Sequence, residues 1–143
     1  MNLNAVVEQL KLDEGFSAKS YFDNDQWTWG YGTKAPGPEA RITRANAEVA
    51  LVARTQAAIA DFADVFAGVE MSEVRQHAFV NMLFNLGETK LRKFKKMLAA
   101  VRAGDWEGAA AQATSSLWYR QLSKPDNGQE ERAERIVREI KEG

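Results

Sequence analysis

The stretch DEGFSAKSYFDNDQWTWGYGT, residues 13–33, decides the fold. It holds four carboxylates and three glycines, whereas the segments on either side carry helical patterns. Before it, apolar residues recur at three- and four-residue intervals, which predicts a helix from about residue 3 to Glu14, ended by Gly15. Within residues 16–37, aromatic and β-branched residues are broken by Asn-Asp, Gly-Tyr-Gly and Pro-Gly-Pro. That pattern predicts a small hairpin-rich region, the only sheet we expect.

Beyond this stretch the sequence predicts helices. Thr43 is a plausible N-cap for a long alanine-rich helix that runs to about Phe66. Ser72 caps an apolar helix that we expect to be the buried centre of the larger lobe. Further helices are expected at about 93–103, 106–114 and 129–142, the last one after a Pro-Asp-Asn-Gly turn.

These elements predict an α+β, mostly helical fold with two lobes in one domain, residues 1–143. The expected parts are a small β-containing lobe at 15–42, a helical lobe made of 1–14 and 67–143, and an interlobe helix at 43–66.

Composition narrows the classes of function. The chain has no cysteine and one histidine, His77, so no disulfide, metal site or other cofactor is expected. A net charge of −1 gives no global argument for binding nucleic acid. The N-terminal segment has no signal-peptide pattern and no apolar run is long enough to span a membrane, so we expect a cytoplasmic protein without a membrane partner. The basic cluster KLRKFKK, residues 90–96, is either a solvated helix face or a contact for an anionic surface.

The chemistry-bearing residues of the opening stretch are two carboxylates and a hydroxyl: Glu14, then Asp23, then Thr28. Such a set suits general acid–base hydrolysis, in which one acid protonates the leaving group and the other activates water. The carboxyl end of a helix carries partial negative charge, which favours the protonated form of an acid that lies there. The alternative is purely structural: Asp23 and Asp25 as turn residues and Glu14 as an ordinary helix-end carboxylate.

Several motifs resemble the bacteriophage lysozyme (endolysin, muramidase) family of the T-even and lambdoid type. They are Glu14-Gly15, YFD at 21–23 and TWGYGT at 28–33. Further similarity covers ITRANAEVAL from Ile42, HAFVNMLFNLGE from His77, GDWEGAAAQATSSLWYRQ and RAERIV. The resemblance therefore extends over nearly the whole chain and implies a lysozyme-like two-lobed fold.

By this resemblance the family's general acid falls on Glu14, its water-handling aspartate on Asp23 and its water-holding threonine on Thr28. The implied reaction is hydrolysis, with inversion, of the β-1,4 bond between N-acetylmuramic acid and N-acetylglucosamine in peptidoglycan. Thr28 follows Asp23 by five positions, one fewer than in typical members, which makes Asp25 a rival for the role of Asp23. The implied protein is a monomeric endolysin that stays in the host cytoplasm until lysis and depends on a separate membrane-permeabilising holin.

The resemblance also implies residues that bind substrate: Thr33, which replaces a family histidine, then Phe84, Asn85 and Gln112. For Phe84 a plain core position is an equal alternative. Arg132 takes the place of a family arginine that contacts the catalytic glutamate; the alternative is a charge on a solvated face.

Two other functions stay open at this point. A lytic transglycosylase needs a catalytic acid but no Asp/Thr pair for water, so the presence of Asp23 and Thr28 argues against it. A non-catalytic wall-binding descendant of the fold is the other alternative, and the complete Glu/Asp/Thr set disfavours it.

Overall fold

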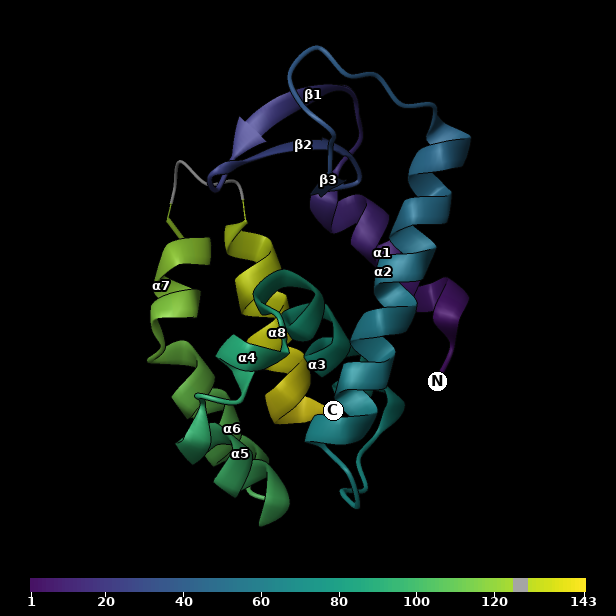
Figure 1. Cartoon of the computed structure of the whole chain (residues 1–143). Coiled ribbons are helices and arrows are strands. Elements are labelled where there is room, and N and C mark those ends of the chain that lie inside the picture. The colour runs from purple at the N-terminus through teal and green to yellow at the C-terminus, as the bar shows by residue number, and fades with distance from the viewer. Residues whose placement is uncertain (125–128) are drawn as a thin grey trace. The chain divides into compact units, whose positions relative to one another are not determined.

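The computed structural model describes residues 1–124 and 129–143. Within those ranges the chain forms eight helices and one antiparallel sheet of three strands, which confirms the α+β, mostly helical class (Figure 1). The Pro-Asp-Asn-Gly turn expected at 125–128 lies outside the described residues. Two compact units make up the chain: residues 2–57, and residues 58–143 together with Met1. We call them the N-terminal and C-terminal units; the lobe limits expected from the sequence stay a prediction.

The N-terminal unit begins with α1 (Leu3–Glu14), which has the predicted bounds. The Asn2 side chain accepts a hydrogen bond from the amide of Ala5 and so caps the first turn. At the other end Gly15 has φ 68, and its amide donates to the carbonyl of Lys11. A positive φ is easily adopted by glycine, which explains why the helix stops there and leaves Glu14 as its last residue.

Three strands follow: β1 (Ser17–Asp23), β2 (Gln26–Gly30) and the short β3 (Thr33–Lys34), in the order β1-β2-β3. The expected hairpin region is therefore confirmed. Asn24 and Asp25 join β1 to β2, with φ values of 50° and 63°. Positive φ at both central residues is what a two-residue type I′ hairpin turn requires, and Asn and Asp tolerate it better than most residues.

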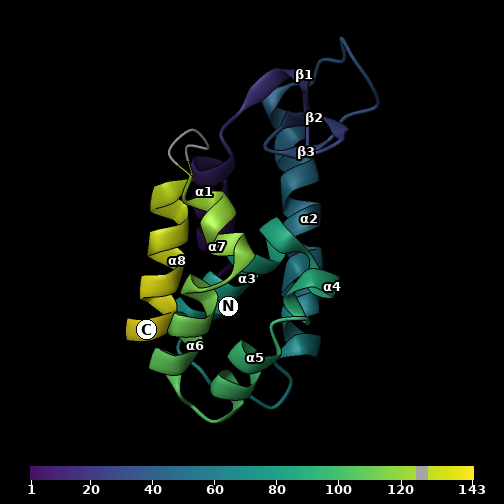
Figure 2. The ribbon, with the colours of Figure 1, turned by 90° about the vertical axis from the view of Figure 1, so that its left-hand side faces the viewer.

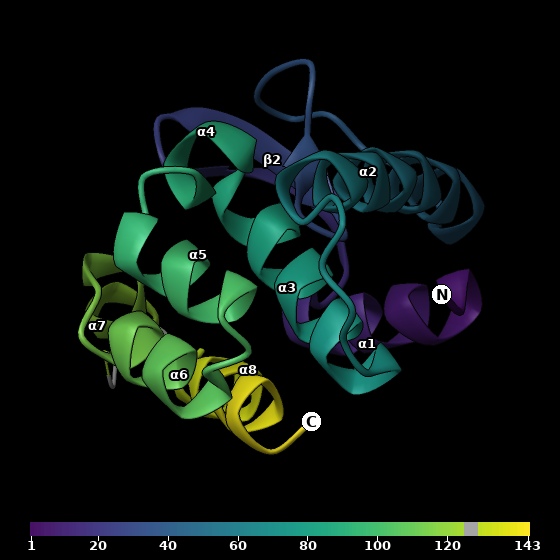
Figure 3. The ribbon, with the colours of Figure 1, turned by 90° about the horizontal axis from the view of Figure 1, so that it is seen from below.

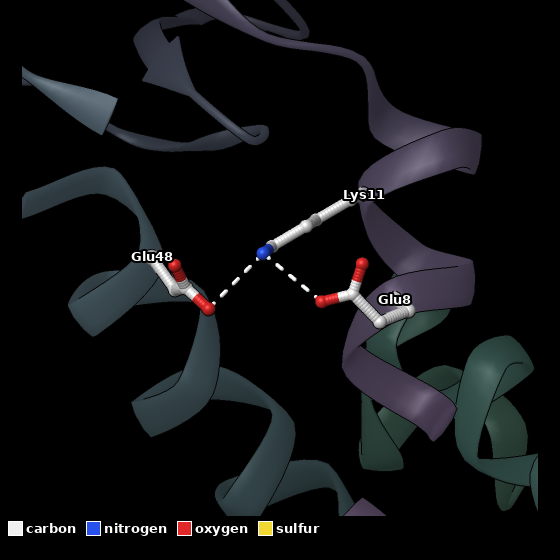
Figure 4. Close-up of polar contacts among 3 residues, drawn as sticks. All are labelled: Glu8, Lys11 and Glu48. Atoms are coloured by element: carbon white, nitrogen blue, oxygen red, sulfur yellow. Dashed lines mark hydrogen bonds and ion pairs between the residues drawn. The ribbon is translucent and has the colours of Figure 1, made fainter. Parts of the chain in front are cut away.

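The first part of α2 (Arg44–Val65) closes the N-terminal unit. Thr43 caps it as predicted, because the Thr43 hydroxyl accepts from the amide of Asn46 at 3.2 Å. Lys11 ties α1 to α2: its ammonium lies 3.1 Å from Glu8 Oε1 on its own helix and 3.0 Å from Glu48 Oε1 on α2 (Figure 4). The hydrogen bond to Glu48, and to a smaller extent the one to Glu8, raises the pKa of Lys11.

The C-terminal unit is built around α3 (Glu73–Leu86), capped by Ser72 as predicted. Seven consecutive residues of α3, 78–84, are buried, which confirms it as the centre of the helical part. Helix α8 (Glu130–Glu142) packs against α3 and against α6 (Trp106–Thr114), and α6 packs against α5 (Lys95–Arg102) (Figure 2).

Two short helices complete the C-terminal unit: α4 (Glu88–Leu91) and α7 (Leu117–Leu122). The helix expected at 93–103 is shorter than predicted, because Phe94, at φ −78° and ψ 59°, leaves the helical conformation just before α5. In the parts of the chain that the structure describes, no helix is long and apolar enough to cross a membrane.

Candidate active site

The side chain of Glu14 lies against the backbone of Gly32. A Cβ atom added at Gly32 would collide with Glu14 Oε1 and lie 3.1 Å from Glu14 Cδ. Gly32 also has φ 82°, a conformation that L side chains rarely adopt. The carbonyl of Gly32 accepts a hydrogen bond from Arg54 Nη1 at 2.9 Å, which holds this turn to α2. The fold thus brings the helix-end acid and the glycine-rich bend together. This supports the interpretation that they form one site, and not the alternative that each is only a structural helix end or turn.

Asp23 and Thr28 lie on one face of the β1–β2 hairpin. The register pairs Tyr21 with Thr28 and Asp23 with Gln26. Directly opposed residues of antiparallel strands point to the same face, and residues two apart on one strand share it. The two-residue turn therefore places Asp23 and Thr28 on the same face. It does so although Thr28 follows Asp23 by one position fewer than in the family that the sequence resembles.

Asp25, the rival to Asp23, occupies a different position. It is the second central residue of the turn, beyond the last paired residues of the two strands. Asp23 by contrast is the last residue of β1 and belongs to the ladder. Both side chains are exposed. The ladder fixes the direction of Asp23 relative to Thr28, whereas no strand pairing orients Asp25.

Tyr21 connects the two predicted carboxylates electrostatically. Burial raises the pKa of the Tyr21 phenol, and the negative charges of Asp23 and then Glu14 raise it further. Both carboxylates therefore act on the same phenol, which remains partly exposed. Sequence reasoning did not single out Tyr21, although it belongs to the YFD motif, and it missed Gly32 and Arg54 as supports.

Thr33 is placed differently from the rest of the predicted set. It pairs with Trp29, the neighbour of Thr28 on β2, so it points to the opposite face of the sheet. Thr33 is buried, as Thr28 is, and the Thr33 hydroxyl oxygen has no hydrogen-bond partner among the described residues. Thr33 therefore does not lie on the hairpin face that carries Asp23 and Thr28. Its contact with substrate stays a prediction.

Arg132 is not a charge on a solvated face, because only 4% of it is exposed. Its Nε donates to Asn81 Oδ1 at 3.0 Å, and its Nη1 donates to Gln129 Oε1 at 3.0 Å. Asn81, also buried, thus gains the partner that a polar residue in an apolar helix requires. The contact of Arg132 with Glu14 that the resemblance implies stays a prediction.

The three other predicted substrate contacts belong to the C-terminal unit. Phe84 has 3% of its surface exposed. It is therefore a core residue, which was the alternative to a substrate contact. Asn85 is exposed, and its Oδ1 accepts from Trp118 Nε1 at 2.9 Å. Gln112 is exposed and lines a cavity of about 700 Å³ formed by residues 86–121 of this unit. Of the three, Asn85 and Gln112 are the ones that reach the surface.

No group of three or more histidine, aspartate or glutamate side chains in residues 1–124 and 129–143 is arranged to hold a metal ion. The polar groups near the hairpin of the N-terminal unit include two carboxylates, a hydroxyl and a phenol, those of Glu14, Asp23, Thr28 and Tyr21.

Comparison with known proteins gives one family and two relatives. A family model described as phage lysozyme matches residues 11–135. The pre-baseplate central spike protein Gp5 of Enterobacteria phage T4 is 29% identical over 147 residues, which cover 82% of this chain and 25% of that protein. The probable T4-type lysozyme 2 of Dictyostelium discoideum is 36% identical over 53 residues, which cover 37% of this chain and 31% of that protein. The chain thus spans less than a third of the length of these curated relatives.

Proposed function

The chain belongs to the phage lysozyme family, and on that premise we propose that it hydrolyses peptidoglycan. The bond we propose is the β-1,4 link between N-acetylmuramic acid and N-acetylglucosamine. One arrangement within the N-terminal unit carries the proposal. The Glu14 carboxyl group rests on Gly32, and the Tyr21 phenol, on the hairpin face of Asp23, is influenced by both carboxylates.

In the proposed reaction Glu14 gives its proton to the glycosidic oxygen as the bond to the anomeric carbon breaks. A water molecule attacks that carbon, and Asp23 takes the proton that the water loses. The Thr28 hydroxyl, on the same hairpin face as Asp23, hydrogen-bonds this water. Attack from the side opposite the leaving group inverts the anomeric carbon, which requires the two carboxyl groups to lie roughly 6.5–9.5 Å apart.

The decisive experiment measures dye release from purified peptidoglycan sacculi and the masses of the released fragments. Glu14→Gln should lower the rate by at least about 100-fold, since it keeps the size of the side chain and removes its proton. Glu70→Gln, which changes an exposed carboxylate of the C-terminal unit, is the matched control and should keep full activity. Undiminished activity of Glu14→Gln would remove Glu14 from the reaction.

The fragment masses separate the competing functions. Fragments that end in reducing muramic acid indicate hydrolysis, whereas 1,6-anhydro ends indicate a lytic transglycosylase, which uses no water. Binding of sacculi without any release by the wild-type chain would indicate a non-catalytic wall-binding protein. The presence of Asp23 and the Thr28 hydroxyl on one hairpin face favours hydrolysis.

We extend the proposal to host lysis by a monomer that reaches the wall through a separate membrane-permeabilising holin. Expression inside a bacterium should then leave the cells intact until the inner membrane is permeabilised, for example by a co-expressed holin. Lysis without permeabilisation would contradict the need for that partner. Light scattering of the purified chain at a known concentration gives the oligomeric state.

A further inference from the structure

The cavity of the C-terminal unit has a basic rim that the proposed reaction does not use. Its lining includes four lysines, which we call the lysine rim: Lys90, Lys93, Lys95 and Lys96. They come from α4, from the start of α5 and from the segment between them. Because all four line the same cavity, they meet at one place in the unit. Figure 3 shows α5 between α4 and α6.

No acidic side chain balances the lysine rim. All four lysines are exposed, and in the described part of the chain none of them forms an ion pair. Residues 88–102 carry six basic side chains and one acidic one, Glu88, in a chain of net charge −1. Glu88 is paired with Arg92, at 2.7 Å, and the lining of the cavity contains no Asp or Glu. Four uncompensated ammonium groups in one place repel each other and attract an anion.

The rest of the lining is part apolar and part polar. Its apolar side chains are Leu86, Phe94, Met97, Leu117 and Trp118, and its polar ones are Gln112, Ser115, Ser116 and Gln121. Leu117, which lines the same cavity as the lysines, is 59% exposed. At about 700 Å³ the cavity lies in the size range of sites that hold a small organic molecule. A ligand that satisfies both parts of this lining has anionic groups at one end and an apolar portion at the other.

We propose that the lysine-rimmed cavity binds the phosphate headgroup of an anionic lipid at a membrane surface. The ammonium groups bind the phosphate oxygens, while the glycerol and the first carbons of the acyl chains cover the apolar side chains of the lining. The cationic side chains of the lining are all lysines, compact point charges that bind phosphate oxygens. Lysines beside an exposed leucine and a tryptophan are the combination that binds the interface of a bilayer. This binding does not depend on the proposed hydrolysis.

The test measures sedimentation of the full chain with large unilamellar vesicles, either of phosphatidylcholine alone or with about a third phosphatidylglycerol. The test variant carries Lys90→Gln, Lys93→Gln, Lys95→Gln and Lys96→Gln. The matched control carries Lys19→Gln, Lys34→Gln, Lys124→Gln and Lys141→Gln, four exposed lysines elsewhere, so both variants lose the same charge. Circular dichroism and the melting temperature check that each variant is folded.

The wild-type chain should bind the anionic vesicles but not the neutral ones, and less as salt is raised. Each lysine near an anionic surface contributes about fivefold to binding, so the rim variant should lose at least roughly fiftyfold while the control loses far less. Leu117→Gln should weaken binding at high salt, where the apolar contact remains.

Two results would overturn the proposal. Equal losses in both variants would mean that net charge alone governs binding. A rim variant that binds vesicles like the wild type but no longer binds purified sacculi would assign the lysine rim to carboxylates of the cell wall.

Discussion

The carboxyl group of Glu14 lies directly against the backbone of Gly32, the second glycine of the Gly-Tyr-Gly bend. This contact joins the end of α1 to the turn between β2 and β3, two elements that are separate in the sequence. Space for the carboxylate exists because residue 32 has no side chain. The shape of the bend and the position of the acid are therefore coupled.

Gly32→Ala should nearly abolish hydrolysis and lower stability. The new methyl group would collide with Glu14 Oε1 and displace the Glu14 carboxyl group, and alanine at φ 82° costs about 1–2 kcal/mol in the left-handed region. Thermal unfolding and dye release from sacculi measure the two effects. Gly37→Ala is the control, because a Cβ there meets nothing within 4 Å and its φ is not positive. Full activity of Gly32→Ala would show that the carboxyl group does not act from this position.

Asp23 and Asp25 should respond differently to substitution. Asp23→Asn should reduce the hydrolysis rate by at least about 100-fold, since it removes the proposed base on the face of Thr28. Asp25→Gly should keep the activity and change stability by less than about 1 kcal/mol, because Asn-Gly is a preferred type I′ pair. Rates on sacculi and melting temperatures of both variants decide the assignment. The opposite result, with Asp25 essential, would transfer the water-activating role to the turn.

Tyr21 should make the wild-type protein sensitive to alkali. The pKa of its phenol is raised above the usual value of 10.0, so the folded chain holds this proton more tightly than the unfolded chain. Stability from this group is therefore complete below pH 10 and is lost as the pH rises through the higher folded-state pKa. The melting temperature should fall less between pH 8 and pH 11 in Tyr21→Phe than in the wild type. Tyr119→Phe, a phenol of the C-terminal unit, is the control and should behave as the wild type does.

The buried bond between Arg132 and Asn81 should contribute measurably to stability. Asn81→Ala removes the acceptor of the Arg132 Nε proton and should cost about 1–3 kcal/mol of unfolding free energy. Asn81→Asp keeps an acceptor oxygen at the same place, so it should lose less. Urea unfolding of the two variants and the wild type gives the comparison. Equal losses would mean that volume, and not the hydrogen bond, determines the role of Asn81.

Much of the secondary structure could be predicted from local signals. Gly15, Thr43 and Ser72 mark helix ends by cap chemistry, which acts over three or four residues and is visible in the sequence. The break at Phe94 could not be predicted, because the sequence there has no glycine or proline. At the break the amide of Lys95 donates to the carbonyl of Lys93, two residues back, which is not an α-helical bond.

Some parts of the candidate site could be predicted from the sequence, and others could not. Asp23 and Thr28 share a hairpin face for a local reason, the two-residue turn at Asn24 and Asp25. The contact of Glu14 with Gly32 depends on how α1 and the sheet pack, and no local pattern encodes that distance. Tyr21 stayed unnoticed because strand tyrosines are common and the sequence does not show which of them lie near two acids.

The contact at Gly32 also gives a criterion for comparing other chains with this one. A protein that aligns over this bend but carries any larger residue at the equivalent of Gly32 has no room for a carboxylate placed as Glu14 is here. Such a protein must hold its acid elsewhere or do without it. One position without a side chain thus distinguishes chains that can keep this arrangement of acid and bend from those that share only the fold.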